Sequence, residues 1–148
     1  LVHPSAKKAI AEANGLTLLQ QVLCGTNLSA ASQAAGALWA LCVDGDDIKG
    51  SIATAAVVRT LIRLLDTEVA TRASFSHSQR TELQSRVAGC ISEVCIRNPT
   101  VKSKIGSAGA IPELINVCKG DDITCQRLAA QGLCNLVANH HGNKRLAK

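Results

Sequence analysis

The fold of this chain is decided by the stretch KSKIGSAGAIPEL, residues 102–114. It places a lysine three positions before one apolar residue, Ile105, and nine positions before another, Ile111. The pattern occurs twice earlier and begins again near the end of the chain, at Lys7, Lys49 and Lys144. The four lysines lie 42, 53 and 42 residues apart, so a unit of about 42 residues recurs and its middle copy carries 11 extra residues. A period of this length predicts a solenoid of stacked helical units.

Each unit predicts one short helix followed by two longer ones. In the third unit, Pro112 falls in the first turn of the middle helix, where its missing N–H costs nothing. The longer helices are separated by Gly120 and Asp122, and by Gly25 and Asn27 in the first unit. We expect each glycine to end a helix in the left-handed conformation and each polar residue to cap the next. Three apolar pairs of the last helices should point inward: Leu38/Leu41, Ile91/Val94 and Leu133/Leu136.

Residues 107–115 (SAGAIPELI) and 128–136 (LAAQGLCNL), followed by Asn143-Lys144, resemble an armadillo repeat. Residues 34–41 (AAGALWAL) carry the resemblance in the first unit. It implies an all-α fold, a right-handed α-solenoid of armadillo repeats with three helices per repeat. HEAT repeats, which have two helices, are the nearest alternative and fit the Gly-Ala-Ile-Pro turn less well.

The resemblance covers essentially the whole chain apart from the insertion and gives its expected division. Residues 1–11 would be the end of a preceding repeat and a short first helix. Repeats would follow at 12–53, at 54–106 with the 11-residue insertion within 67–82, and at 107–148. Both ends look as if they were cut through a longer array, because neither resembles the polar terminal repeat that a solenoid needs.

The armadillo resemblance implies a concave groove, lined by the third helix of each repeat, that binds a partner polypeptide. The residues expected to face such a partner are Arg86, Glu93, Arg97, Arg127, Gln131, Asn135 and Asn139. In importin-alpha and its relatives this face carries a tryptophan and an asparagine four residues apart. Only Asn135 matches, and Trp39 lies three residues past the tryptophan position, so we expect Trp39 in the core or against the neighbouring unit. An importin-like cargo adaptor is therefore the less favoured reading.

Charge adds a second expectation about the partner. The chain has a net charge of +5, and residues 54–106 hold eight basic residues against four acidic ones. A basic groove would steer acidic partners towards it, although an ordinary solvated surface explains the same charges. Nucleic acid is an unlikely partner, because Trp39 and Phe75 are the only aromatic residues and provide no stacking platform.

The inserted stretch, Thr67 to Glu82, is rich in Ser, Thr, Arg and His. It predicts a mobile loop at the edge of the solenoid, where insertions are tolerated and often carry binding. Within it, Arg72-Ala73-Ser74-Phe75 resembles a basic-directed kinase site, which makes Ser74 a candidate phosphosite. A passive surface loop is the alternative.

No catalytic or cofactor-binding constellation is present in the sequence, so we expect neither an enzyme nor a cofactor. His140-His141 and Cys134 lack the ligand spacing of a metal site. Seven cysteines, an odd number without a C-x-x-C pair, indicate reduced thiols in the cytoplasm or nucleus. The chain contains no long apolar run and no secretory signal, so membrane insertion is not expected.

Two functions fit these observations. The first is a non-enzymatic scaffold or adaptor that binds a partner polypeptide along the third-helix groove. The alternative is a structural spacer that self-associates end to end within a larger assembly.

Overall fold

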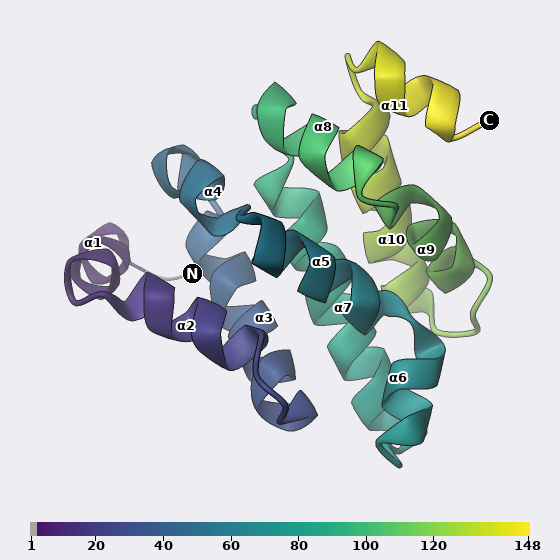
Figure 1. Ribbon diagram of the computed structural model, residues 1–148, viewed down its shortest axis with the longest axis horizontal. Coiled ribbons are helices and arrows are strands. Elements are labelled where there is room, and N and C mark those ends of the chain that lie inside the picture. Colours follow the sequence, from purple (N-terminus) through teal and green to yellow (C-terminus); the bar gives the residue numbers. More distant parts are fainter. Residues whose placement is uncertain (1–2) are drawn as a thin grey trace.

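The computed structural model describes residues 3–148 and shows an all-helical chain within them (Figure 1). Residues 1–2 of the expected first segment lie outside the described residues. The helices are α1 (Pro4–Glu12), α2 (Gly15–Leu23), α3 (Leu28–Cys42), α4 (Asp46–Ile52), α5 (Ala55–Leu65), α6 (Thr67–Arg72), α7 (His77–Val94), α8 (Pro99–Ser107), α9 (Ala110–Cys118), α10 (Ile123–Val137) and α11 (His141–Leu146).

Counted from each short helix, the units are α1–α3, α4–α7 and α8–α10, and the helices of the first and third units recur with the same spacing. Each begins and ends 95 residues after its counterpart, in the pairs α1 and α8, α2 and α9, and α3 and α10. Three polar side chains at one repeated position cap the short helices. Asn98 accepts a hydrogen bond from the Val101 N–H at 3.0 Å, His140 accepts from Asn143 at 3.1 Å, and His3 caps α1. His140 therefore serves as a helix cap.

The repeated lysine closes the end of the third helix. Lys102 Nζ donates to the carbonyl oxygen of Ala138 at 2.8 Å, and Lys7 Nζ donates in the same way to Val43. Ala138 and Val43 are the C-caps of α10 and α3, where carbonyl groups lack helical partners and a positive charge is favoured. The lysine thus joins the short helix to the third helix of the same unit.

A left-handed residue follows each third helix. Asp44, Arg97 and Asn139 have φ angles of 57°, 56° and 55°, and they occupy equivalent positions in the three units. The expectation that Gly25 and Gly120 would be left-handed was wrong, since neither has a positive φ. The turns at these glycines depend instead on the expected caps. Asn27 accepts from Ala30 N–H at 2.9 Å, and Asp122 accepts from Cys125 N–H at 2.8 Å.

The three long helices α3, α7 and α10 pack side by side in one layer, and α2, α5 and α9 lie in front of them in Figure 1. The expected inward residues are buried, except that Leu133 is only partly so. Trp39 packs against the next unit, as the sequence predicted. A Cβ atom on Gly89 would lie 2.6 Å from the Trp39 indole ring, so the tryptophan fits only because this position of α7 has no side chain.

The prediction of a mobile loop over Thr67 to Glu82 was wrong. The insertion forms α6, a short turn and the first part of α7. Ala70 is buried, and Val69 and Phe75 pack partly against the core, which anchors the segment. A capping box formed by Ser76 and Gln79 starts α7.

Ser74 lies exposed in the turn between α6 and α7, with a φ of 57°. Its modification remains a prediction. This turn is short, with α6 directly before it and α7 directly after it.

Replacing Gly89 by alanine should lower the free energy of unfolding by about 1–3 kcal/mol, the usual cost of overpacking. The added methyl group would meet the Trp39 ring, whereas one on Gly50 in α4 would have Asn98 Nδ2 as its nearest neighbour, at 4.0 Å. Gly50→Ala is therefore the matched control and should raise stability by roughly 0.4–1 kcal/mol. Urea unfolding followed by the fluorescence of Trp39 measures both. Equal stability of the Gly89→Ala variant and the parent would show that Trp39 does not pack as described.

Candidate functional site

We call the surface formed by α3, α7 and α10 the third-helix face. All seven residues expected to meet a partner lie on this face or just beyond its helix ends, where Arg97 and Asn139 follow α7 and α10. Four of them are exposed, namely Arg97, Arg127, Gln131 and Asn139. The other three are partly buried by contacts with other helices: Arg86 with α3, Glu93 with α4 and Asn135 with α7.

Arg86 bridges the first and second units. From α7 it pairs with Glu82 at 2.6 Å and donates to Ser32 Oγ on α3 at 3.3 Å. Its stem lies over Gly36, where an added Cβ atom would stand 3.2 Å from Arg86 Cδ. Since its charge is already balanced by Glu82, Arg86 acts mainly as a contact between helices.

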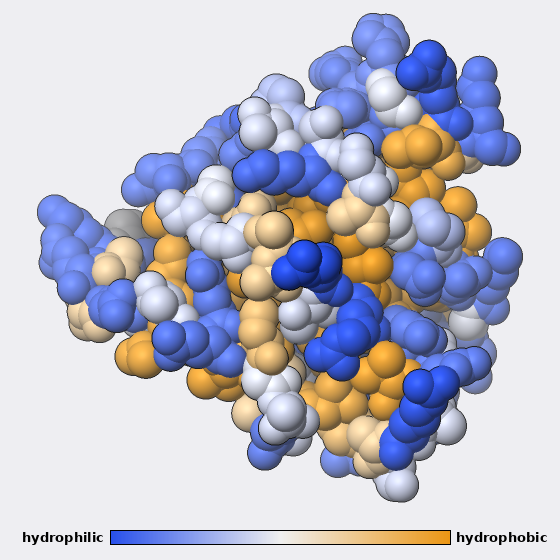
Figure 2. All heavy atoms as spheres, viewed as in Figure 1, coloured by the Kyte–Doolittle hydropathy of each residue, from blue (hydrophilic) through white to orange (hydrophobic). Residues whose placement is uncertain are grey.

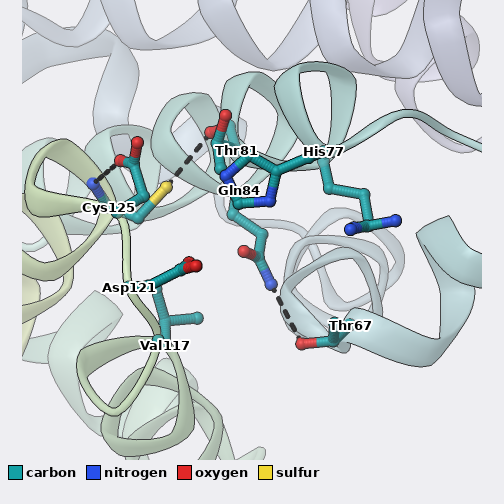
Figure 3. A pocket seen from close by; sticks show the side chains of 10 residues that line it. Thr67, His77, Thr81, Gln84, Val117, Asp121 and Cys125 are labelled. Carbon is teal, nitrogen blue, oxygen red and sulfur yellow. Dashed lines mark hydrogen bonds between the residues drawn. The ribbon is translucent and has the colours of Figure 1, made fainter.

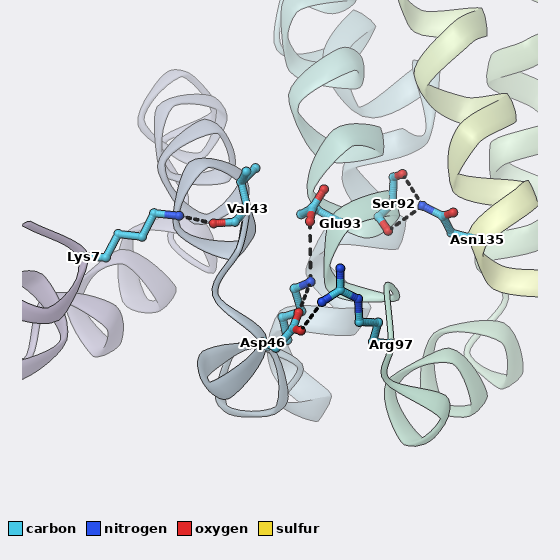
Figure 4. A network of polar contacts seen from close by, with 8 residues as sticks. Lys7, Val43, Asp46, Ser92, Glu93, Arg97 and Asn135 are labelled. Carbon is cyan, nitrogen blue, oxygen red and sulfur yellow. Dashed lines mark hydrogen bonds and ion pairs between the residues drawn. The ribbon is translucent and has the colours of Figure 1, made fainter. Parts of the chain in front are cut away.

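An ionic cluster joins α4 to the end of α7 (Figure 4). The Lys49 ammonium group is 2.7 Å from a carboxylate oxygen of Asp46 and 3.5 Å from one of Glu93, and Arg97 lies 3.1 Å from Asp46. Lys49 is only 1% exposed, so it needs these carboxylates to offset the loss of water. The hydrogen bond from Lys49, helped by the charge of Arg97, holds the pKa of Asp46 below its ordinary value of 3.8.

Asn135 bridges the second and third units. Its Nδ2 donates to the Ser92 carbonyl oxygen at 3.1 Å and to Ser92 Oγ at 2.9 Å (Figure 4). Gln131 in turn donates to Asn135 Oδ1 at 3.2 Å. The side-chain amide of Asn135, which matches the importin-like position, therefore donates to the neighbouring helix α7.

The basic groove expected from the charge count is not what the structure contains. Arg86 and Arg97 alone among the eight basic residues lie on or beside the third-helix face, and each pairs with a carboxylate. Lys102 caps a helix. Four of the other five lie on different helices, Arg59 and Arg63 on α5, Arg72 on α6 and Lys104 on α8. Arg80 lies near the start of α7, within the insertion and away from the part of α7 that packs between α3 and α10 in the expected groove. Arg127 on α10 is the exposed guanidinium group that remains on the face.

A hollow of about 230 Å³ lies between the start of α7 and the turn from α9 to α10 (Figure 3). Its lining includes Thr67, Thr81, Gln84, Asp121 and Cys125. Several of these groups are bonded locally, because Gln84 donates to Thr67 Oγ1 at 3.3 Å and the Cys125 thiol donates to the Thr81 carbonyl at 3.1 Å. Sequence reasoning missed this hollow because it depends on the insertion folding back against the third unit.

The cysteines are all free, and their environments differ. Burial raises the pKa of Cys95 to about 12, and burial with the nearby Asp122 raises the pKa of Cys125 to about 12. These two thiols therefore remain protonated at neutral pH. Within residues 3–148 no group of three or more His, Cys, Asp or Glu side chains is placed to hold a metal ion.

No helix in the described part of the chain is both long and apolar enough to cross a membrane.

The chain is similar in fold to an engineered protein whose crystal structure was determined by the Northeast Structural Genomics Consortium. The TM-score is 0.83 at 24% sequence identity. The similarity covers 99% of this chain and 55% of the engineered protein, so the chain spans about half the length of that protein. At this identity the likeness establishes the fold alone. No protein-family description and no curated protein matches the chain.

Asn135→Ala should lower the free energy of unfolding by about 1–3 kcal/mol, because the carbonyl and hydroxyl groups of buried Ser92 lose their partner. Gln131→Ala is the matched control, one turn earlier on the same helix. It removes an exposed side chain and should change stability by less than about 0.5 kcal/mol. Thermal and urea unfolding of both variants measures the difference. A neutral Asn135→Ala change would mean that the bridge to α7 contributes nothing.

Asp46→Asn should make stability less dependent on pH on the acid side. The pKa of the Asp46 carboxyl group is lowered in the folded chain, so its stabilisation is complete above 3.8 and is lost as pH falls through the lower folded value. The variant should therefore be less stable than the parent at pH 7, and the gap between the two should narrow as pH falls below 3.8. Urea midpoints between pH 3 and pH 7 test this. A constant gap at every pH would contradict the assignment.

Proposed function

We propose that the chain is part of a right-handed armadillo solenoid and serves as a non-enzymatic scaffold. In this proposal a partner polypeptide binds along a concave groove lined by α3, α7 and α10. One observation carries it. The third helices are tied side by side through Arg86 and Asn135, so they present one continuous face on which Arg127 and Gln131 remain exposed.

The size of the face indicates the kind of partner. Adjacent helix axes are roughly 8–10 Å apart and a helix is about 10 Å wide, so three helices span on the order of 26–30 Å. An extended segment of about eight or nine residues covers this length at roughly 3.3 Å per residue. Arg127 and Gln131 can donate hydrogen bonds to its backbone carbonyl groups or to its carboxylates.

A segment that binds here would not be held by repeated asparagines, as it is in importin-alpha and its relatives. Asn135 is the matching asparagine, and both of its amide hydrogens point to Ser92. Affinity would therefore depend on the exposed donors and on contact with Trp39, which is partly exposed between α3 and α7. Free thiols at all seven cysteines support a reducing compartment, the cytoplasm or nucleus, for this interaction.

A second candidate is end-to-end self-association. Val22 on α2 is 44% exposed, whereas the equivalent residues Leu64 and Val117 are 0% and 5% exposed. Leu18 on the same helix is 55% exposed. The outer side of α2 thus offers an apolar surface that the other units cover. Sedimentation velocity at several concentrations tests this candidate, and a monomer throughout would rule it out.

The groove proposal predicts that a peptide selected on this chain binds the third-helix face. Random 12-residue peptides displayed on phage would be selected on the immobilised chain, and an enriched peptide would be measured by fluorescence anisotropy. Arg127→Ala combined with Gln131→Ala should weaken binding at least tenfold without changing the melting temperature. The peptide should also change the emission of Trp39, the only tryptophan.

The matched control is Lys8→Ala combined with Glu12→Ala. These residues form an exposed ion pair at 3.7 Å on α1, away from the face. The control should bind the peptide as tightly as the parent chain. Failure to enrich any peptide, or binding that survives the Arg127 and Gln131 changes, would reject the groove as the site.

A further inference from the structure

Part of the positive charge of residues 54–106 lies on helices outside the third-helix face. Arg59 and Arg63 lie one turn apart on α5, Lys104 lies on α8, and all three side chains are exposed. None of them forms an ion pair in residues 3–148. In Figure 2, which is viewed as Figure 1, strongly hydrophilic side chains gather over α5 beside hydrophobic ones.

Acidic residues that could neutralise this cluster are scarce around it. The sequences of α5 and α8 contain none, and α9, which packs on α5, contributes only Glu113. Glu113 is half-buried and makes no ion pair with the three basic residues. Like charges four residues apart on a helix repel one another, so Arg59 and Arg63 would be stabilised by an anionic partner.

An apolar hollow of about 270 Å³ adjoins these charges. It lies between α5 and the end of α8 and is lined by Ala55, Val58 and Ala108, with Arg59 and Lys104 at its rim. An apolar cavity of about 150 Å³ is sufficient to hold benzene. The hollow can therefore receive one leucine or phenylalanine side chain of a partner.

From this arrangement we infer a second binding site, on the outer side of the molecule, for an acidic amphipathic segment of another protein. One apolar side chain of the segment enters the hollow, and flanking carboxylates pair with Arg59, Arg63 and Lys104. Charge complementarity and the single-residue size of the hollow select this occupant. A simple anion would use the charges and leave the hollow empty. The site is independent of the groove, since it shares no residue with the third-helix face.

A direct test uses a fluorescein-labelled 12-residue peptide with one leucine flanked by glutamates at four-residue spacing. It should bind the chain, and binding should weaken at least tenfold with Arg59→Glu, with Lys104→Glu, or when the leucine is replaced by serine. Ala55→Gln, which fills the hollow and keeps every charge, should also weaken binding. Ala55 is exposed, so the change should be compatible with folding, and circular dichroism checks it.

Lys119→Glu is the matched control, because it makes the same charge change at an exposed position at the end of α9. It should leave binding unchanged, as should Arg127→Ala combined with Gln131→Ala, which separates this site from the groove. Equal weakening by Lys119→Glu would show attraction by net charge and overturn the proposal. The proposal also fails if the chain binds phosphatidylserine vesicles, and loses that binding with Arg59→Glu, while it does not bind the peptide. It fails too if inorganic phosphate displaces the leucine peptide and the serine peptide equally well. It fails as well if the surface mediates self-association that Arg59→Glu abolishes.

Discussion

The contact on which the architecture depends is the lysine that closes the end of a third helix. Lys7 and Lys102 each reach from a short helix to the last free carbonyl of the long helix in the same unit. The contact satisfies an orphan acceptor and places positive charge at the negative end of the helix. It also sets the distance between the two helices, so the middle helix must pack across both. Lys7 and Lys102 therefore occupy equivalent positions because each makes this contact within its own unit.

Neighbouring units are held together by side-chain contacts that differ from one junction to the next. The first junction uses Arg86 over Gly36 and Trp39 over Gly89, and the second uses Asn135 bonded to Ser92. These positions are on the face that the sequence indicates for a partner. A residue cannot both hold a neighbouring helix and remain free for a ligand without cost, so in the proposed groove the exposed donors Arg127 and Gln131 would have to carry the binding.

The local features of the fold were predictable from the sequence, and the long-range ones were not. Helix bounds follow from the repeat and from caps such as Asn27 and Asp122, whose partners lie three residues away. The insertion was misjudged because composition hides its few anchoring residues, Val69, Ala70 and Phe75. The basic groove was misjudged for a related reason. A count of charges over 54–106 does not say which helix face each side chain occupies, and Arg59 and Arg63 lie on α5 while Arg86 crosses to Ser32.

The middle unit departs from the pattern in ways that are linked. Its lysine, Lys49, is buried against Asp46 and Glu93 instead of capping the end of α7, and Arg97 in the left-handed position joins the same cluster. A left-handed arginine is strained relative to glycine, and its ion pair with Asp46 is exposed and so offsets only part of that cost. The same unit holds the insertion and the unpaired charges of α5. Since the flanking units repeat one another closely, the departures from the repeated pattern are concentrated in residues 46–97.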